Sequence, residues 1–254
     1  MIALRAWLAC CALAFRLAWL GAPPAVWAQA GPQAAPVSDL GRAAELIVRH
    51  ANEVRTAEKR LATATDERLA RAALAFAQFM ARTDKYGHEA DGSTPAQRTE
   101  RQGYAFCMVS ENLGFLRSSA GFGTEELARR FVEGWTRSAG HRANMVDPDA
   151  TQTGAAVAFS ERTGRYYAVQ LFGRPKSAMF EVQIANRADR PVAYRVGART
   201  FELAPRATRV HSQCRAETIT LAEPTDPHAA ALHPRSATKV AIERDGAGLR
   251  WGSQ

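Results

Sequence analysis

Three side chains that can bind a metal ion or move a proton lie in polar segments of the sequence. His88 lies in KYGHEADG, Glu111 in SENLG and His141 in SAGHRANM. A neutral imidazole offers a nitrogen lone pair to a divalent ion such as Zn²⁺, and a carboxylate adds charge or orients an imidazole ring. The same residue types also act as general acids and bases. The residues therefore allow two kinds of site, a site that binds a metal or another ligand and a hydrolytic site.

Serine and cysteine side chains near these segments leave nucleophilic hydrolysis open as well. Ser110 precedes Glu111, Cys107 lies four residues before it, and Ser138 lies three residues before His141. A serine or cysteine nucleophile needs a base within hydrogen-bond reach. The sequence places none of these side chains beside a histidine, so it assigns no catalytic residue.

Helical periodicity predicts the elements that position these segments. Apolar residues recur at intervals of three and four in three stretches. The first follows a cap at Ser38 or Asp39 and ends near residue 60, and the second starts at Thr65. The third, TEELARRFVEGWTRSAG, is capped by Thr124 and ends at Gly140, because glycine adopts the left-handed conformation without strain. A shorter helix is expected from Pro95 to Gln102. The candidate residues would then lie at the ends of elements, where functional side chains concentrate.

Strand-like segments follow the third helix. TGAAVAFS and RYYAVQLFG flank ERTG, which contains Gly164, and this pattern predicts a hairpin. GRPKS marks a boundary near residues 173–177. Beyond it the pattern changes to short β-type runs: AMFEVQIA, PVAYRV, TFELA, TRVHS, ETITLA and TKVAIER. These runs predict a small all-β domain at residues 178–254.

The N-terminal residues resemble an export signal. Residues 1–28 combine Arg5, an apolar run and small residues near Ala28, which is typical of a secretory signal peptide. Arg16 interrupts the apolar run and argues against a membrane anchor, because a charge is costly in lipid. Residues 29–37, QAGPQAAPV, are expected to form a flexible leader. We therefore expect a secreted or periplasmic protein with no transmembrane segment in the mature chain.

Two cysteines remain after the signal peptide, Cys107 and Cys214. In an exported protein two thiols can pair, and this disulfide bond would tie the C-terminal segment to the main domain. The alternative is two separate buried thiols. The chain has no CxxC motif, so a structural zinc site of the cysteine type is not expected.

The charge is unevenly distributed along the chain. The formal net charge is +8, and residues 174–254 contain 13 basic and 8 acidic residues, whereas residues 29–173 contain 18 and 17. The basic residues are nearly all arginines that do not occur in runs and are not interleaved with stacking aromatic residues, so nucleic-acid binding is not expected. A weak attraction to anionic surfaces follows from the net charge.

The order of the motifs resembles a known family. GH…DG…P…R…GY…SEN(L)…W..S.GHR.NM…P..T..G.A, followed by YYAVQLFG, is similar to the bacterial branch of the CAP superfamily. That superfamily is named after cysteine-rich secretory proteins, antigen 5 and pathogenesis-related protein 1. The resemblance covers about residues 40–173. It implies an α+β fold, a three-layer α-β-α sandwich (the CAP/SCP fold) at residues 38–174, followed by the small all-β domain.

The resemblance also implies a cleft with a tetrad of two histidines and two glutamates. His88, Glu111 and His141 match three of the four positions, and Ser138 stands where many members have the second glutamate. The implied metal ligands are His88 and His141, for an ion such as Zn²⁺, with Glu111 orienting one ring or acting through a water molecule. Glu133 does not replace the missing glutamate, because helix geometry directs it to the exposed side among arginines.

Members of this superfamily bind sterols, fatty acids, peptides or ions. We therefore expect an exported binding module for a small lipid, a peptide or a divalent metal, or for a component of the cell envelope. The alternative is a metal- or Glu-assisted hydrolase of peptide, ester or cell-wall substrates, with Glu111 and His141 as its candidate catalytic residues. A third alternative is a structural or adhesive role for the C-terminal β segment.

Overall fold

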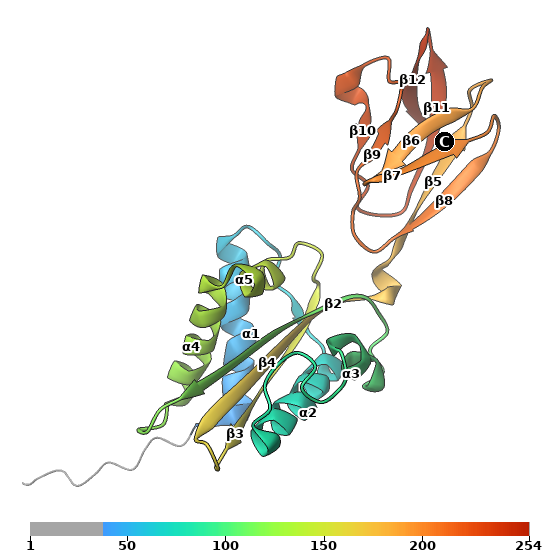
Figure 1. Cartoon of the computed structure of the whole chain (residues 1–254). Coiled ribbons are helices and arrows are strands. Elements are labelled where there is room, and N and C mark those ends of the chain that lie inside the picture. Colours follow the sequence, from blue (N-terminus) through green and yellow to red (C-terminus); the bar gives the residue numbers. More distant parts are fainter. Residues whose placement is uncertain (1–37, 254) are drawn as a thin grey trace, which may run out of the picture. The chain divides into compact units, whose positions relative to one another are not determined.

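The computed structural model describes residues 38–253 (Figure 1). The signal peptide expected at residues 1–28 and the leader expected at residues 29–37 lie outside these residues, so both stay predictions. Within the described residues, no helix has both the length and the apolar character that crossing a bilayer requires.

A four-stranded sheet in the order β1-β3-β4-β2 forms the centre of the first part of the chain. Its strands are β1 (Ala64–Thr65), β2 (Phe106–Arg117), β3 (Gln152–Ser160) and β4 (Arg165–Pro175). The three long strands are antiparallel neighbours, whereas β1 pairs with β3 in parallel over two residues. The β3–β4 hairpin was expected, and Gly164 in its turn has a φ of 66°.

Helices cover both faces of this sheet, which confirms the three-layer α-β-α sandwich (Figure 1). On one face lie α1 (Leu40–Ala57), α4 (Thr124–Arg137) and α5 (Ala139–Met145). On the other face lie α2 (Glu67–Thr83) and α3 (Pro95–Arg101). The sheet therefore has a hydrophobic core on each side.

Among the described residues, three of the five α-helices start with a side-chain cap. Asp39 accepts from the backbone N–H of Arg42 at the start of α1, and Asp66 accepts from the N–H groups of Arg68 and Leu69 at the start of α2. Thr94 forms a capping box with the third residue of α3, which satisfies backbone donors that have no partner within the helix. At α4 the expected cap is displaced by one residue, because Gly123 is the N-cap and Thr124 is the first helical residue.

The interpretation of one helix that ends at Gly140 is wrong. Ser138 has an extended backbone (φ −93°, ψ 119°), which interrupts the helical hydrogen bonds, so α4 ends at Arg137 and α5 begins at Ala139. Gly140 lies inside α5, where glycine costs only about 1 kcal/mol relative to alanine. His141 consequently lies in a short helix of its own.

The expectation that Glu111 lies at the end of an element is also wrong. Glu111 is in the middle of β2, a strand of 12 residues. Both faces of β2 are covered by helices, so its sequence lacks the alternation of apolar and polar residues that marks a half-exposed strand. The site is therefore built on the sheet itself rather than on loops alone.

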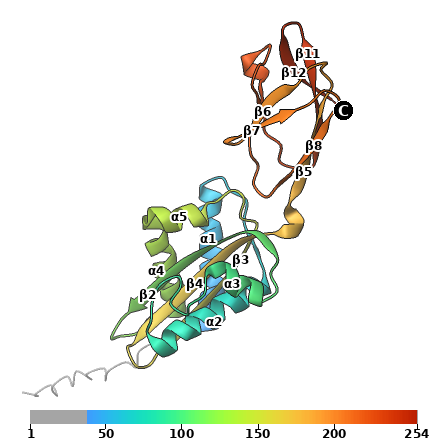
Figure 2. The same ribbon diagram turned by 45° about the vertical axis from the view of Figure 1, so that its right-hand side comes forward.

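The C-terminal part is all-β, as expected, and its two four-stranded sheets share one apolar core (Figure 2). The first sheet has the order β12-β11-β5-β8, and the second has the order β10-β9-β6-β7. The bounds are β5 Phe180–Asn186, β6 Val192–Val196, β7 Arg199–Leu203, β8 Thr208–Gln213, β9 Ile219–Leu221, β10 Ala231–Leu232, β11 Thr238–Asp245 and β12 Gly248–Ser253. The sequence did not predict β10 and β12.

A disulfide bond joins Cys107 to Cys214, with 5.7 Å between the Cα atoms. Of the two alternatives, pairing is therefore the one that the structure shows. Next to this bond, Arg215 contacts the carboxylate of Asp147 at 2.8 Å. Arg142 does not pair with Asp147 and contacts Glu58 instead.

Candidate functional site

Glu111 is the buried centre of the site. Its side chain is 1 % exposed and points to the same face of the sheet as Leu113, which packs into the core beside α2. A carboxylate in such surroundings is costly unless charged and hydrogen-bonding groups compensate for the lost water.

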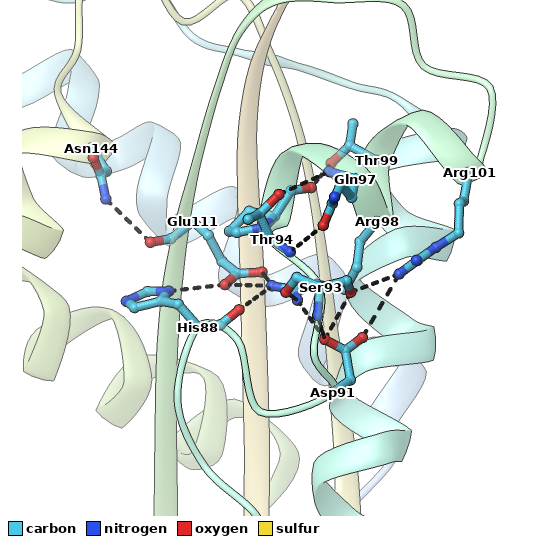
Figure 3. A network of polar contacts seen from close by, with 11 residues as sticks. His88, Asp91, Ser93, Thr94, Gln97, Arg98, Thr99, Arg101, Glu111 and Asn144 are labelled. Carbon is cyan, nitrogen blue, oxygen red and sulfur yellow. Dashed lines mark hydrogen bonds and ion pairs between the residues drawn. The ribbon is translucent and has the colours of Figure 1, made fainter.

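Arg98 of α3 provides that compensation (Figure 3). Its Nη2 donates to both carboxylate oxygens of Glu111, at 3.0 and 2.8 Å, and the arginine side chain is only 4 % exposed. The guanidinium carbon lies 3.5 Å from the centre of the Phe76 ring. The ion pair is thus enclosed between β2, α2 and α3, where water screens it poorly.

The loop between α2 and α3 is fixed to the same guanidinium group. Nη1 of Arg98 donates to Asp91 at 3.0 Å and to the carbonyl of Ser93 at 2.6 Å, and Nη2 donates to the carbonyl of His88 at 2.8 Å. Burial alone would raise the pKa of Asp91. The hydrogen bonds from Ser93 and the charge of Arg98 outweigh burial and lower it. Asp91 therefore stays charged and holds the loop in place.

His88 is the exposed end of this network. Its side chain is 53 % exposed, and its Nδ1 lies 2.9 Å from a carboxylate oxygen of Glu111 (Figure 3). A carboxylate that accepts from Nδ1 keeps the proton there and leaves the lone pair of a neutral ring on Nε2. Buried charged groups thus hold an imidazole in one orientation at the surface.

His141 approaches the site from the other side of β2. Burial and, to a lesser degree, the charge of His88 lower its pKa. Asn112, which is fully buried, donates from Nδ2 to the carbonyl of His141 at 3.1 Å. Asn144 donates to the carbonyl of Glu111 at 3.2 Å and to the Asn112 side chain at 3.0 Å. These two asparagines attach α5 to the edge of β2.

Of the residues expected in the cleft, His88 and Glu111 are in direct contact, and His141 is linked through its carbonyl to Asn112, the residue that follows Glu111 in β2. Ser138 lies at the junction of α4 and α5, and its hydroxyl does not cap α5. Glu133 pairs with Arg129 on the surface, as helix geometry predicted. Sequence reasoning assigned no role to Arg98, although the arginine belongs to the motif that carried the resemblance. Its partner is distant in sequence and becomes visible only when α3 packs against β2.

The donor set does not make a complete metal site. Among residues 38–253, no group of three or more His, Cys, Asp and Glu side chains is placed to hold an ion. Both oxygens of Glu111 already accept from Arg98, so this carboxylate is not free to bind a metal directly. The residues fit at most two imidazole ligands, completed by water, with Glu111 orienting His88.

Nucleophilic hydrolysis finds little support in the geometry. Cys107 is in a disulfide bond, so the thiol version of the hydrolase hypothesis is wrong. The hydroxyl oxygen of Ser110 is buried and makes no hydrogen bond with the described residues. Within residues 38–253, the ring of His88 bonds to Glu111 and to no serine hydroxyl.

Comparison with known proteins identifies one match at the level of sequence. A sequence model of the cysteine-rich secretory protein family (CAP) matches residues 48–172. These residues include His88, Glu111 and His141. No curated protein matches the sequence significantly.

Solved structures that are similar to this chain include three bacterial proteins. An outer surface protein from Borrelia burgdorferi is 20% identical, with a TM-score of 0.46, over 53% of this chain and 93% of that chain. An extracellular protein containing a SCP domain from Bacillus anthracis is 21% identical, with a TM-score of 0.43, over 53% and 41% of the two chains. A cysteine-rich secretory protein from Staphylococcus aureus is 15% identical, with a TM-score of 0.42, over 55% and 40%. The match thus spans less than half the length of the last two proteins.

Proposed function

The chain contains a domain of the cysteine-rich secretory protein family, and on that premise we propose that it is an exported binding protein. In this proposal the binding cleft holds His88 and His141 as the residues that contact the ligand, and the buried Glu111 orients His88. The proposed ligand is small and is a lipid, a peptide or a divalent ion.

One observation carries this proposal, the hydrogen bond from Nδ1 of His88 to the buried carboxylate of Glu111. A buried ion pair stabilises a fold little, because desolvation offsets most of the attraction. Here the pair orients a half-exposed imidazole, and such support by buried groups is typical of sites that must recognise a ligand with fixed geometry. Desolvation of Arg98 and Glu111 costs free energy, and the orientation of His88 gives a reason for that cost.

The orientation of His88 defines what the site can bind. Its Nε2 lone pair accepts a hydrogen bond from a ligand or coordinates a divalent ion such as Zn²⁺, with His141 as the second protein ligand. A metal bound there would supply a positive centre for an anionic or carbonyl group of a ligand. Because Ser138 brings no carboxylate, the site is less negative than a full tetrad, so we expect a divalent ion to bind weakly.

Calorimetric titration with ZnCl₂ tests whether the site binds a divalent ion. We expect wild-type protein to bind one ion and the His88→Ala and His141→Ala variants to bind it at least about tenfold more weakly, since each loses one of two ligands. His228→Ala, in an exposed 3-10 helix of the β domain (Pro227–Ala229), is the matched control and should bind as wild type does.

Native mass spectrometry of the metal-free protein tests whether the site binds a lipid or a peptide. A co-purified lipid or peptide that is lost in His88→Ala would support the same surface as its binding site. If wild type and both histidine variants behave alike in both measurements, the proposal is wrong.

A hydrolase is the second candidate, and the His88–Glu111 pair favours one version of it. An imidazole oriented by a carboxylate can act as a general base toward water. Glu111 itself is a poor base, because Arg98 occupies both of its oxygens. Hydrolysis of peptide, ester or cell-wall substrates that is abolished in His88→Ala but retained in His228→Ala would establish this version.

A further inference from the structure

Strands β2 and β3 are the outer long strands of the central sheet. Their free edges are covered in different ways. Along β2, the carbonyl of Leu113 accepts from Nε1 of Trp135 at 2.8 Å, and the carbonyl of Glu111 accepts from Asn144. Side chains of α4 and α5 thus cap that edge. On the opposite edge, β3 is paired only by the two residues of β1.

The backbone groups that face this second edge can be identified. The carbonyls of Thr151 and Thr153 accept from the N–H groups of Ala64 and Asp66, so odd-numbered residues of β3 direct their polar groups away from β4. Because strand residues alternate, Ala155, Val157 and Phe159 also present N–H and C=O groups at this edge. Among residues 38–253, no hydrogen bond to these six groups comes from the β1 side.

This edge lies at the bottom of a groove. The groove has a volume of about 680 Å³, and its walls are the start of α1, with Gly41 and Ala44, and one stripe of α2, with Ala70 and Leu74. It continues past Phe159 into a hollow of about 550 Å³ beside the β3–β4 turn. Leu74 and Phe159 are 41% and 39% exposed, so both add apolar surface to the groove.

We propose that the β3 edge is a docking site for an extended, uncharged segment of a partner protein, which adds a strand to the sheet. The segment would continue the ladder that β1 begins, parallel to β3, and would pair with Ala155, Val157 and Phe159. Its side chains would be small or apolar, because alanines, a glycine and Leu74 line the walls. The lining contains one acidic and one basic side chain, Glu67 and Arg71, which lie 3.7 Å apart and neutralise each other, so the groove matches a neutral segment.

Two other occupants match the groove less well. An acyl chain would fill the apolar space but would leave the row of backbone donors and acceptors without partners, at a cost for each group. A second copy of this chain would have to bring its own β3 edge into contact, and that edge is recessed between α1 and α2. An isolated extended segment has neither disadvantage.

The probe for the test is a capped heptapeptide of sequence TVAVAVT, together with a twin that carries N-methyl groups on alternate residues. The twin keeps every side chain and loses the donors that would pair with β3. Amide hydrogen exchange of the full chain is the readout. We expect the peptide to slow exchange at Val157 and Phe159 by about tenfold or more, and the twin to have no effect, since only the first forms the ladder.

Two variants locate the binding. Ala155→Pro removes one N–H from the open edge, and Leu74→Asp places a charge in the groove wall. Each should weaken peptide binding by about three- to tenfold, the loss expected for one hydrogen bond or one apolar contact. Leu61→Asp is the control, because Leu61 is 88% exposed and lies outside the groove. Leu74→Asp keeps the test valid if Ala155→Pro does not fold, since Leu74 is an exposed helical residue.

The results of these experiments distinguish an added strand from a lipid and from a second copy of this chain as the occupant of the groove. Equal binding of the peptide and its N-methylated twin would overturn strand addition, and so would unchanged exchange at Val157 and Phe159. Displacement of the peptide by a fatty acid that binds more tightly would assign the groove to a lipid. Concentration-dependent protection of Val157 without any peptide would assign it to a second copy.

Discussion

Arg98 and Glu111 form a buried ion pair in which one guanidinium nitrogen donates to both carboxylate oxygens, at 3.0 and 2.8 Å. The same nitrogen donates to the carbonyl of His88, and the carboxylate also contacts the His88 ring. The pair therefore fixes both the backbone and the side chain of His88. Removal of either partner leaves the other charge buried, and this asymmetry makes the relationship testable.

Arg98→Gln should lower the free energy of unfolding by about 3–5 kcal/mol, because Glu111 would remain buried without its charged partner. Urea denaturation measures the change. Arg101→Gln is the matched control on the same helix: Arg101 is 60% exposed, and its loss should cost less than about 1 kcal/mol. A cost below about 1 kcal/mol for Arg98→Gln as well would show that the pair is not buried as described.

Loss of the contact between Asn112 and His141 should change both the stability of the fold and the surroundings of the His141 ring. Asn112→Ala removes the donor to the His141 carbonyl and the acceptor for Asn144, so we expect a loss of about 1–3 kcal/mol in stability. Because α5 would also shift relative to β2, the NMR signals of the His141 ring should move. Asn52→Ala, which removes contacts to Thr63 far from the site, is the control and should leave those signals in place.

Much of the fold could be predicted from local signals. Asp39, Pro95 and Gly164 act within a few residues of themselves, as a cap, a first helical residue and a turn residue, so the elements that they mark were placed correctly. The central strand β2 was missed for two physical reasons. Both of its faces are covered, which removes the alternation, and Gly114 interrupts the apolar run. A Cβ atom at Gly114 would lie 3.1 Å from the ring of Phe131, so the glycine permits close packing rather than a turn.

The candidate site was predictable only in part. His88, Glu111 and His141 were recognised through the motif order, because their residue types suggest chemistry by themselves. Arg98 has no such signal, since an arginine in a short helix is ordinarily a surface residue. Its burial depends on contacts with Phe76 and Glu111, which are distant in sequence. The sequence also did not predict the open edge of β3, because that edge is left unpaired by the short length of β1.

Substitution by alanine should change the stability of the fold in opposite directions at Gly154 and Gly134. A Cβ atom at Gly154 would lie 2.2 Å from the backbone nitrogen of Ala70, so Gly154→Ala forces α2 away from β3 and should cost about 1–3 kcal/mol or more. A Cβ atom at Gly134, in α4, meets nothing within 4 Å, and Gly134→Ala should raise stability by about 0.5–1 kcal/mol. Thermal unfolding of both variants checks the sign. Equal shifts would contradict the close contact between β3 and α2.

His211 of the β domain predicts a dependence of stability on pH. Burial first, and then the charges of Arg209 and Arg199, lower its pKa below the usual 6.5, against the opposing charge of Glu217. The unfolded chain therefore takes up the proton at a higher pH than the folded chain. By linkage, the contribution of His211 is complete above pH 6.5 and is lost as the pH falls from there through the lowered pKa.

Hydrogen exchange of the β5 amides between pH 5 and pH 8 measures this loss, after correction for the intrinsic effect of pH on exchange. His211→Gln should make the stability of the β domain less dependent on pH across this range. His228→Gln, which changes an exposed histidine of the same domain, should leave the dependence as in wild type. If the two variants give the same profile, the low pKa of His211 does not contribute to stability.

The Cys107–Cys214 bond joins segments on either side of the connection that contains Ser177. A protease site introduced at the exposed Ser177 should therefore yield one species after cleavage in a non-reducing gel and two fragments in a reducing gel. The Cys107→Ser/Cys214→Ser variant should yield two fragments in both gels. Two fragments from the oxidised protein without these substitutions would show that the bond does not form. Because the bond closes a long loop, with a sequence separation of 107, its loss should also lower the stability of the uncut chain by about 4–5 kcal/mol in the chain-entropy description.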